Sequence, residues 1–344
     1  MDFPASISLT ITNVCNLRCR MCGQWSEEGY MHDRKKGLKQ EMTLDDWKRV
    51  VDELAAHSVP ALLIRGGEPF LHPQIIKLLE YIHSQGMFIS IDTNGTLLAQ
   101  YAADVARIGK IHLTVSVDGP EEIHDQVRGV SGCFARLKEG LAQLNELDPD
   151  GRISRSITFT ISKYSYRGLG AMPDVARSLG IGAVCIVPYY YVPQEVGERY
   201  AQELREHLGC EAFSWSGFHH EDSGVDFDEF KAQLARYQDT LGDVYSFPYM
   251  PMTEDEYRIW FQDAVTPVGP LACTNVEKLI DIQPQGNANF CVDFPDYTIG
   301  NVKESTIAEI WNGERAARFR EYRRQQPLAV CTRCGAKYMS EIDV

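Results

Sequence analysis

Short strand-like runs alternate with helical patterns along the first half of this 344-residue chain. In the first run, residues 6–12, Ile7, Leu9 and Ile11 alternate with serine and threonine, which is the period of a half-buried strand. Five more β-rich runs follow, at residues 61–65, 88–92, 112–117, 156–161 and 183–187. Alternating strands and helices form parallel βαβ units with right-handed crossovers. We therefore expect an α/β fold, a partial (β/α)6 barrel of the TIM type that is open on one side.

The helices between these strands have recognisable ends. Residues 44–57 follow Thr43, and Asp46 stands three positions after that threonine, which is the pattern of a capping box. Pro73 begins a second helix, which ends before Gly86. Three further helices are expected at residues 97–107, 133–146 and 170–179.

Polar and glycine-rich motifs directly follow the strands of the predicted barrel. Residues 66–69 (GGEP) follow the second strand, residues 92–95 (DTNG) follow the third, and Ser116 ends the fourth. In β/α barrels the chemistry takes place at the carboxyl ends of the strands, in the loops that follow them. Any one of these glycines alone could be ordinary turn chemistry. Together, the motifs predict a functional site at this end of the barrel.

Three cysteines follow the first strand with the spacing C-x3-C-x2-C, at Cys15, Cys19 and Cys22. Thiolates bind soft metals, and structural zinc or ordinary iron–sulfur clusters take four protein ligands. A set of three leaves one coordination position open, as a reactive centre requires. A zinc knuckle with a distant fourth ligand, or three unconnected core cysteines, would also fit this spacing.

The cysteine spacing and the GGEP motif together resemble the signature of the radical S-adenosylmethionine (SAM) enzymes. In that family three cysteines hold a 4Fe–4S cluster, and its fourth iron chelates the amino and carboxylate groups of SAM. The resemblance implies that Gly66 and Gly67 let the backbone approach the methionine end of SAM. It also implies that Glu68 receives the SAM ammonium group.

The residues after the fourth strand extend this resemblance. The stretch SVDGP, with HDQVRG shortly after it, resembles radical SAM proteins that carry a C-terminal SPASM or twitch extension. By this resemblance Ser116 bonds the ribose hydroxyls, Asn94 joins the SAM-binding residues, and Arg128 pairs with the SAM carboxylate. Arg128 could instead be a solvated charge, and Asp118 could cap the next helix as well as touch a ligand.

A second set of cysteines lies near the end of the sequence, at Cys273, Cys291, Cys331 and Cys334. A hairpin with Gly286 in its turn, then a helix, then C-x2-C resembles the twitch module, the short form of SPASM. Four cysteines can fully ligate one auxiliary 4Fe–4S cluster. The full SPASM pattern needs further cysteines where residues 338–340 (YMS) stand, so one auxiliary cluster is expected. A zinc ribbon uses a comparable set and is the alternative.

These patterns divide the chain into three expected parts. They are the barrel core (residues 1–188), a helical bridging segment that covers the substrate (189–265), and the auxiliary cluster domain (266–344). In the bridging segment, Tyr189 and Tyr190 are expected to line the pocket. His219 and His220 are candidate proton carriers or plain surface histidines.

The amino-acid composition indicates which binding partners and which cellular compartment to expect for this protein. The chain has 34 basic and 48 acidic residues, a net charge of −14, which argues against binding a nucleic-acid backbone. No apolar run approaches the ~20 residues of a membrane span. Ten cysteines in such a chain indicate metal ligation in a reducing compartment rather than disulfides. We therefore expect a cytoplasmic protein without a membrane or nucleic-acid partner.

The resemblance implies the reaction as well. An external one-electron reductant, such as flavodoxin or ferredoxin, would reduce the cluster, and a 5′-deoxyadenosyl radical would then abstract hydrogen from the substrate. Because the cysteine motif begins at residue 15 and leaves no room for a leader-recognition domain, a small molecule is favoured. A sugar, an aminocyclitol or another natural-product intermediate would be oxidised or epimerised. The alternatives are a peptide-modifying enzyme (a RiPP maturase) and, from another class, a non-enzymatic iron–sulfur electron carrier.

Overall fold

One continuous sheet of ten strands organises the computed structural model, which describes residues 3–32, 41–270 and 272–335. The strand order is β10-β9-β8-β1-β2-β3-β4-β5-β6-β7. Its central part is parallel and consists of β1 (Ser6–Thr12), β2 (Ala61–Gly66), β3 (Phe88–Thr93), β4 (Ile111–Ser116), β5 (Ser154–Ile161) and β6 (Ala183–Pro188). All six predicted strands overlap these strands. The partial (β/α)6 barrel is confirmed.

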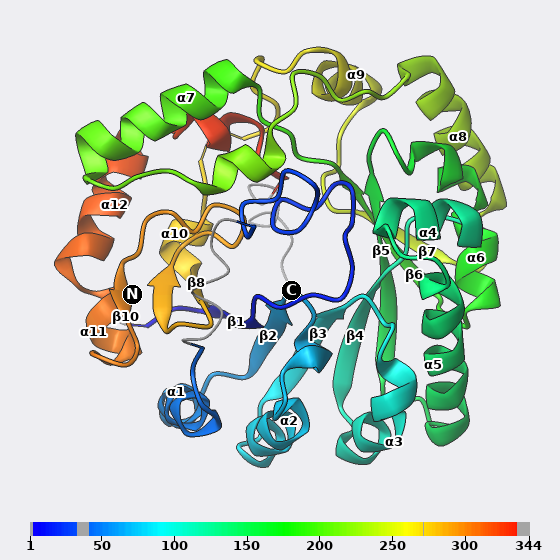
Figure 1. Cartoon of the computed structure of the whole chain (residues 1–344), viewed down its shortest axis with the longest axis horizontal. Helices are drawn as coiled ribbons and strands as arrows, with labels where there is room; N and C mark the ends of the chain where they lie inside the picture. The colour runs from blue at the N-terminus through cyan, green and yellow to red at the C-terminus, as the bar shows by residue number, and fades with distance from the viewer. Residues whose placement is uncertain (1–2, 33–40, 271, 336–344) are drawn as a thin grey trace.

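The helices that follow the strands cover the outside of this sheet (Figure 1). They are α1 (Leu44–Ala56), α2 (Ile75–Ser84), α3 (Leu98–Ile108), α4 (Glu121–Arg128), α5 (Cys133–Leu147) and α6 (Met172–Ser178). The predicted capping box at the start of α1 is present, because Thr43 accepts from the Asp46 N–H and Asp46 accepts from the Thr43 N–H.

The two faces of the sheet differ sharply in polarity. Side chains alternate between faces along a strand, and Leu9, Ile64 and Leu113 are among the fully buried residues that pack toward the helices. The opposite face carries polar and charged side chains such as Arg65 and Thr114, which line a cavity inside the barrel. The interior of this barrel is therefore a polar site rather than a packed apolar core.

The segment between residues 189 and 265 contains helices, as expected, and also a strand. Its helices are α7 (Gln194–Glu203), α8 (Phe227–Thr240) and α9 (Glu254–Gln262), and a π-helical turn, Leu204–Leu208, continues α7. Strand β7 (Tyr245–Pro248) pairs in parallel with β6 and continues the barrel sheet. A purely helical segment was thus an incomplete prediction, because four residues are too short to show a strand period.

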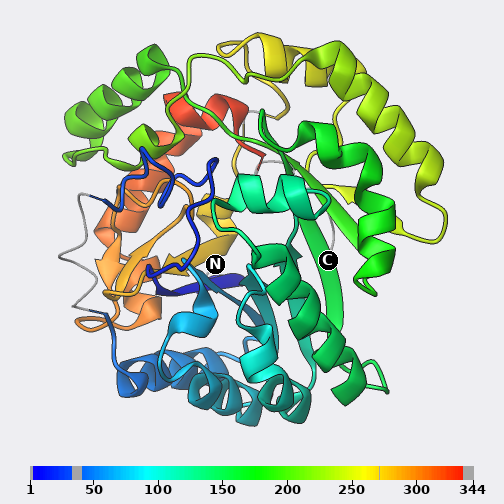
Figure 2. The ribbon, with the colours of Figure 1, turned by 45° about the vertical axis from the view of Figure 1, so that its right-hand side comes forward.

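The C-terminal cysteines belong to a module that adds to the other edge of the sheet. Its elements are α10 (Asn275–Lys278), β8 (Leu279–Ile282), β9 (Asn287–Asn289), β10 (Gly300–Asn301), α11 (Ile307–Trp311) and α12 (Glu314–Gln325). The predicted hairpin is present, and Gly286 in its turn has a φ of 90°, which favours glycine. Strand β8 pairs in parallel with β1, so the C-terminal module lies beside the first strand of the barrel (Figures 1 and 2).

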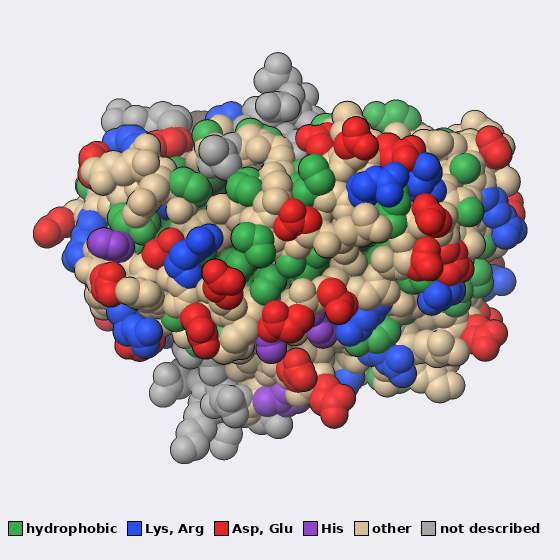
Figure 3. All heavy atoms as spheres, turned by 90° about the horizontal axis from the view of Figure 1, so that it is seen from above, with side chains coloured by type: hydrophobic (Ala, Val, Ile, Leu, Met, Phe, Trp, Pro, Cys, Tyr) green, Lys and Arg blue, Asp and Glu red, His purple; other side chains and the backbone are tan. Residues whose placement is uncertain are grey.

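The surface agrees with the acidic composition. On the face shown in Figure 3, acidic side chains are spread over the surface with Lys and Arg side chains between them. Within the described ranges, the structure contains no helix that is long and apolar enough to cross a membrane.

Candidate active site and metal centres

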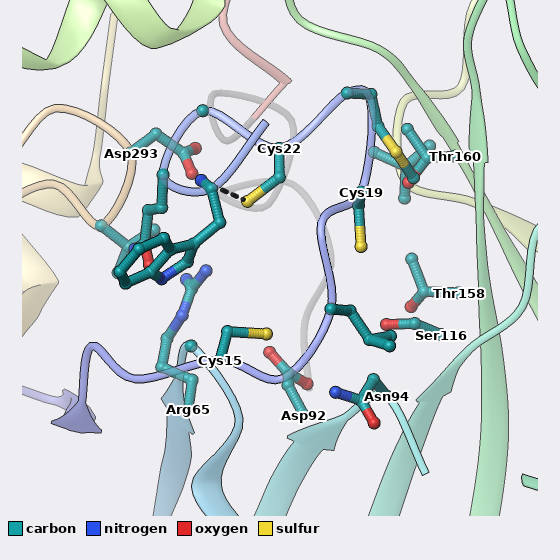
Figure 4. A pocket seen from close by; sticks show the side chains of 18 of the residues that line it. Cys15, Cys19, Cys22, Arg65, Asp92, Asn94, Ser116, Thr158, Thr160 and Asp293 are labelled. Carbon is teal, nitrogen blue, oxygen red and sulfur yellow. Dashed lines mark hydrogen bonds between the residues drawn. The ribbon is translucent and has the colours of Figure 1, made fainter. Parts of the chain in front are cut away.

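A cavity of about 400 Å³ opens at the carboxyl ends of the barrel strands (Figure 4). This volume is in the range of small-molecule sites in proteins. The cavity brings together most of the predicted site residues, which come from five separate loops and strand ends. They are Cys15, Cys19, Cys22, Gly66, Gly67, Asn94, Ser116 and Arg128.

The loop that carries the first three cysteines is fixed by its own backbone and by α4. The backbone N–H groups of Arg18 and Arg20 donate to carbonyls at the end of α4, at 3.1 and 2.8 Å. The Trp25 indole donates to the Asn13 carbonyl at 2.7 Å, and the Trp25 N–H donates to Cys22 Sγ at 3.4 Å. The loop therefore holds its three thiols at the mouth of the barrel without bonds between them (Figure 4).

The protein environment alone does not ionise these thiols. Burial raises the pKa of Cys15 to about 12 and that of Cys19 to about 11. Metal binding must displace these protons, since the thiolate is the ligand. In the described part of the chain, no three His, Cys, Asp or Glu side chains are close enough to hold a single metal ion.

The two glycines of the GGEP motif are required by their contacts with the cysteine loop. A Cβ on Gly66 would lie 2.3 Å from the Thr12 carbonyl oxygen, and a Cβ on Gly67 would lie 2.3 Å from that of Val14. The Gly67 N–H donates to the Thr12 carbonyl at 2.8 Å. We expected glycine at these two positions so that the backbone could approach SAM. The structure adds a second requirement for glycine, which is the close packing of two loops.

Glu68 does not line the cavity, although it was expected to receive the SAM ammonium. Its side chain is fully buried and accepts from the N–H groups of Phe70 and Asn94, at 3.1 and 2.8 Å, and from the Thr93 hydroxyl at 2.8 Å. Burial raises its pKa to about 7, against the lowering effect of these donors. The structure makes Glu68 a positioning residue that ties the second strand end to the third.

Arg128 is buried at the cavity and is not a solvated charge. Its Nε lies 2.6 Å from Oδ2 of Asp118, and its Nη1 lies 3.7 Å from Cys19 Sγ. Asp118 itself is fully buried and also accepts from the Thr160 N–H at 3.4 Å. The aspartate thus neither caps α4 nor faces the cavity, and holds Arg128 beside the cysteine loop instead. The predicted contact of Arg128 with a SAM carboxylate remains a prediction.

Asn94 and Ser116 line the same side of the cavity, near Thr158 and Thr160 on β5 (Figure 4). Asn94 is already held in place, because its amide donates to Asn16 at 2.9 Å and its oxygen accepts from Thr96. Sequence reasoning missed both threonines. Their alternation on β5, with Phe159 buried toward the helices, is the signal that could have found them.

Three charged residues of the cavity were also missed, namely Arg65 at the end of β2, Asp92 on β3 and Asp293 after β9. Burial raises the pKa of both carboxyl groups, and the charge of Arg65 partly offsets this effect. Side chains alternate between the two faces of a strand, and this alternation could have predicted that Arg65 and Asp92 point into the barrel. Nothing in the local sequence around Asp293 indicates that it faces the same space.

Of the other residues that the sequence suggested for the site, some line the cavity and some lie away from it. Tyr189 and Tyr190 line the cavity, as expected. His219 instead pairs with Glu221 at 3.0 Å, and the ring of His220 packs against Tyr189. Three further cysteines lie away from the cavity lining, and one of them, Cys133, donates to Asp125 at 3.1 Å.

A second, smaller cavity brings together the four C-terminal cysteines. Cys273, Cys291, Cys331 and Cys334 line it, mostly among apolar and aromatic side chains such as Phe290, Phe294 and Phe319. The Phe294 N–H donates to Cys291 Sγ at 3.4 Å, which matches the bond from Trp25 to Cys22 at the first site. Such N–H···S bonds tune the potential of a bound cluster. Residues 338–340, where further cysteines would be needed, lie outside the described residues, as do residues 33–40.

Family profiles match two regions of the sequence. Residues 9–161 match the radical SAM superfamily, and residues 273–335 match the SPASM iron-sulfur cluster-binding domain.

Two curated relatives and one solved structure each share a quarter or less of their aligned residues with this chain. The chain is 25% identical to Fe-coproporphyrin III synthase of Methanosarcina barkeri, over 94% of this chain and 79% of that protein. It is 23% identical to the antilisterial bacteriocin subtilosin biosynthesis protein AlbA of Bacillus subtilis, over 99% of this chain and 69% of that protein. The crystal structure of Streptococcus suis SuiB bound to precursor peptide SuiA aligns with a TM-score of 0.61 and 15% identity. This likeness is one of fold, and it covers 91% of this chain but just under two thirds, 66%, of SuiB.

Proposed function

Because this chain is a radical SAM enzyme with a C-terminal SPASM-type iron–sulfur domain, we propose that it modifies a peptide. The observation that carries the substrate class is the charge of the cavity. Among the described residues, four charged side chains line it, the carboxyl groups of Asp92 and Asp293 and the guanidinium groups of Arg65 and Arg128. Such a mixed lining offers acceptors for the N–H and cationic groups of a peptide and donors for its carbonyl oxygens.

The residues of this chain fit the cofactors of the family. Cys15, Cys19 and Cys22 would hold the 4Fe–4S cluster, and the wall with Asn94, Ser116 and Arg128 would hold SAM. When bound, these groups supply a 5′-deoxyadenosyl radical that abstracts a hydrogen atom from the substrate. The protein holds the reacting carbon in place and excludes water and stray hydrogen donors.

The relatives support a peptide more than the small molecule that we expected from the sequence. AlbA is a bacteriocin biosynthesis protein, and the SuiB structure contains a precursor peptide. The expectation of a sugar, an aminocyclitol or another natural-product intermediate therefore gives way to the peptide alternative. The reductant and the net reaction stay predictions.

A second candidate is supported by the match to Fe-coproporphyrin III synthase, which extends over 94% of this chain. A tetrapyrrole of that kind carries several carboxylate side chains. Asp293, whose carboxyl group has no hydrogen-bond donor among the described residues, would repel these groups, so this candidate ranks second.

The four C-terminal cysteines would hold one auxiliary 4Fe–4S cluster. Four ligands close every coordination position of its irons, so this cluster would not bind SAM. Tyr190 lies between the two centres, since its ring lines the active-site cavity and its hydroxyl donates to the carbonyl of Val330, the residue before Cys331. The auxiliary cluster would therefore stand one aromatic side chain from the substrate.

The first experiment tests the SAM chemistry. Under anaerobic reduction, the reconstituted protein should release 5′-deoxyadenosine and methionine from SAM. Cys19→Ala should lose this activity, because it removes a ligand of the cluster that binds SAM, while the auxiliary cluster stays. Cys210→Ala, a cysteine outside both sets, is the matched control and should keep it. Normal turnover by Cys19→Ala would disprove the assignment.

The second experiment tests the substrate class. Cells grown on a deuterated medium are separated into peptide, tetrapyrrole and small polar fractions, and each fraction is incubated with the enzyme and unlabelled SAM. Deuterium should enter 5′-deoxyadenosine from the peptide fraction, as mass spectrometry would show. Label from the tetrapyrrole fraction alone would support the second candidate, and label from the small polar fraction alone would contradict both.

A further inference from the structure

Two charged side chains face the active-site cavity without a hydrogen bond or a close ion pair to any described residue. Arg65 is the next-to-last residue of β2, and Asp293 stands in the loop after β9 (Figure 4). Both are partly exposed, and the space they border is the cavity. Among the described residues, neither side chain has a hydrogen bond or an oppositely charged atom within 4.0 Å. Charged groups that are largely removed from bulk water are normally paired, so both groups are arranged for something that enters the cavity.

The carboxyl groups around Arg65 outnumber it. Asp92, Asp293 and Asp281 all interact electrostatically with its guanidinium. Asp281 accepts from the Thr10 hydroxyl at 3.1 Å, and Asp92 accepts from the Thr114 hydroxyl. Within the described ranges, Asp293 is the one of these three carboxyl groups that accepts no hydrogen bond from a side chain or the backbone. The missing partner is therefore a cationic or N–H donor group.

The position of this pair separates it from the predicted SAM wall. In Figure 4, Arg65 and Asp293 lie on one side of Cys15 and Cys22, whereas Ser116 lies on the other side with the β5 threonines. Asp293 also comes from the C-terminal domain, two residues after the cluster cysteine Cys291. The C-terminal domain thus contributes a charged group to the part of the cavity that lies away from the predicted SAM wall.

We infer that Asp293 binds a cationic group of the substrate, such as the ammonium of a lysine or the guanidinium of an arginine, while Arg65 holds a neighbouring carbonyl oxygen. A peptide offers both groups within one residue, and this inference rests on the proposed peptide substrate. A charge-assisted hydrogen bond to a carboxylate is among the stronger contacts that a protein makes. The pair would therefore select which residue of a peptide is held beside the reacting carbon.

Binding of three matched peptides tests this inference. The probes are acetyl-Gly-X-Gly amides in which X is lysine, norleucine or glutamate, and norleucine keeps the aliphatic chain of lysine without its ammonium group. Dissociation constants are measured anaerobically with the reconstituted, SAM-bound protein by equilibrium dialysis. The lysine peptide should bind at least about tenfold more tightly than the norleucine peptide.

Two variants should shift this preference in opposite directions. Asp293→Asn should abolish the preference and leave the affinity for the norleucine peptide unchanged, because the amide keeps the shape and loses the charge. Arg65→Met should strengthen the preference, because it leaves the carboxylates uncompensated. Asp228→Asn, which changes an exposed carboxylate on α8, is the control and should behave as the wild type. Iron content and circular dichroism verify that each variant is folded.

Equal binding of the lysine and norleucine peptides to the wild type overturns the inference. So does a lysine preference that survives in Asp293→Asn, or no binding of the lysine peptide at millimolar concentration. Tighter binding of the glutamate peptide would also overturn it and would give the leading role to Arg65. If Asp293→Asn does not fold, the direction of the change in Arg65→Met decides. A wild type that cleaves SAM without this preference refutes this inference alone, whereas one that cannot cleave SAM refutes the proposed function.

Discussion

At the scale of single residues, Glu68 joins two turns of the active site through one buried carboxylate. Its three donors come from the turns after β2 and β3, which also carry Gly66, Gly67 and Asn94. The glutamate of the GGEP motif therefore fixes two turns that border the cavity. Its role is geometric, and it differs from the direct contact that the motif predicts.

Glu68→Gln should weaken SAM binding and change the pH dependence of stability. The amide keeps one acceptor oxygen but turns an NH2 group toward the Asn94 N–H, so one hydrogen bond is lost, at about 1–3 kcal/mol. Isothermal titration of SAM and denaturant unfolding measure the two effects. Unchanged SAM affinity and stability would contradict this role.

The pH dependence has a definite sign. Between the ordinary pKa of 4.5 and the folded value of about 7, folded Glu68 keeps a proton that the unfolded chain has lost. The free energy of unfolding contributed by this group therefore falls as the pH rises through that range, by about 3 kcal/mol in total. The difference in stability between wild type and Glu68→Gln should shift accordingly. A difference that stays constant from pH 4.5 to 7 would show an unshifted pKa.

Asp118→Asn should destabilise the protein by about 3–5 kcal/mol, because it leaves the buried guanidinium of Arg128 without its charge partner. Both side chains of this pair are at most 9% exposed. Asp243→Asn is the matched control, since its pair with Arg177 spans 3.3 Å at the surface and Asp243 is 84% exposed. That change should stay within about 0.5 kcal/mol. Denaturant unfolding of both variants measures the contrast, and equal losses would contradict it.

At the scale of elements, one helix of the barrel caps a helix of the C-terminal module. Glu53 on α1 accepts from the N–H groups of Ile307 and Ala308, at 2.9 and 3.1 Å. These are N–H groups of the first turn of α11, which have no partner within their own helix. Thr306 and Glu309 add a capping box at the same end. The start of α11 is therefore fixed from both parts of the chain.

Glu53→Ala should destabilise the start of α11 by about 1.5–3 kcal/mol, the usual value for hydrogen bonds to a charged group. Hydrogen exchange of the α11 amides should quicken, while α3 at the other side of the barrel should be unaffected. Glu80→Ala is the control, because it removes only an exposed pair with Arg107. If α11 exchanges at the same rate in Glu53→Ala and Glu80→Ala, the cap contributes nothing.

At the scale of the whole molecule, one sheet connects the two sets of cysteines. The C-terminal module begins its sheet with β8 beside β1, and the loop with Cys15 leaves the other end of β1. The same module supplies Asp293 to the active-site cavity and the second cysteine set to its own cavity. The two cluster sites are therefore built on one continuous scaffold.

The double variant Cys331→Ala, Cys334→Ala should separate the two clusters. The reconstituted wild type should hold about eight irons per chain, since each cubane carries four, and the variant about four. The variant should keep a SAM-dependent change in its electron paramagnetic resonance spectrum, because the first cluster is intact. Its thermal stability should fall, because metal ligation stabilises the folded module. Eight irons in the variant, or zinc in the wild type at these cysteines, would refute the auxiliary cluster.

The sequence by itself determined the features that depend on short stretches of chain. The six parallel strands follow from periodicity, the capping box of α1 from Thr43 and Asp46, and the radical SAM and SPASM domains from the spacing of the cysteines. Each of these signals lies within a few residues, where backbone geometry and ligand spacing translate directly into local structure.

Only the tertiary structure decided the contents of the cavity. Arg65 and Asp293 are far apart in the sequence, and they border the same cavity because β8 pairs with β1 and places the C-terminal module beside the barrel. Tertiary contacts also decide the position of Glu68. Its side chain lies outside the cavity because two of the donors that hold it are at the end of the neighbouring strand, β3. Which side chain faces a shared space depends on the packing of distant segments, and that information is not present in any single stretch of the chain.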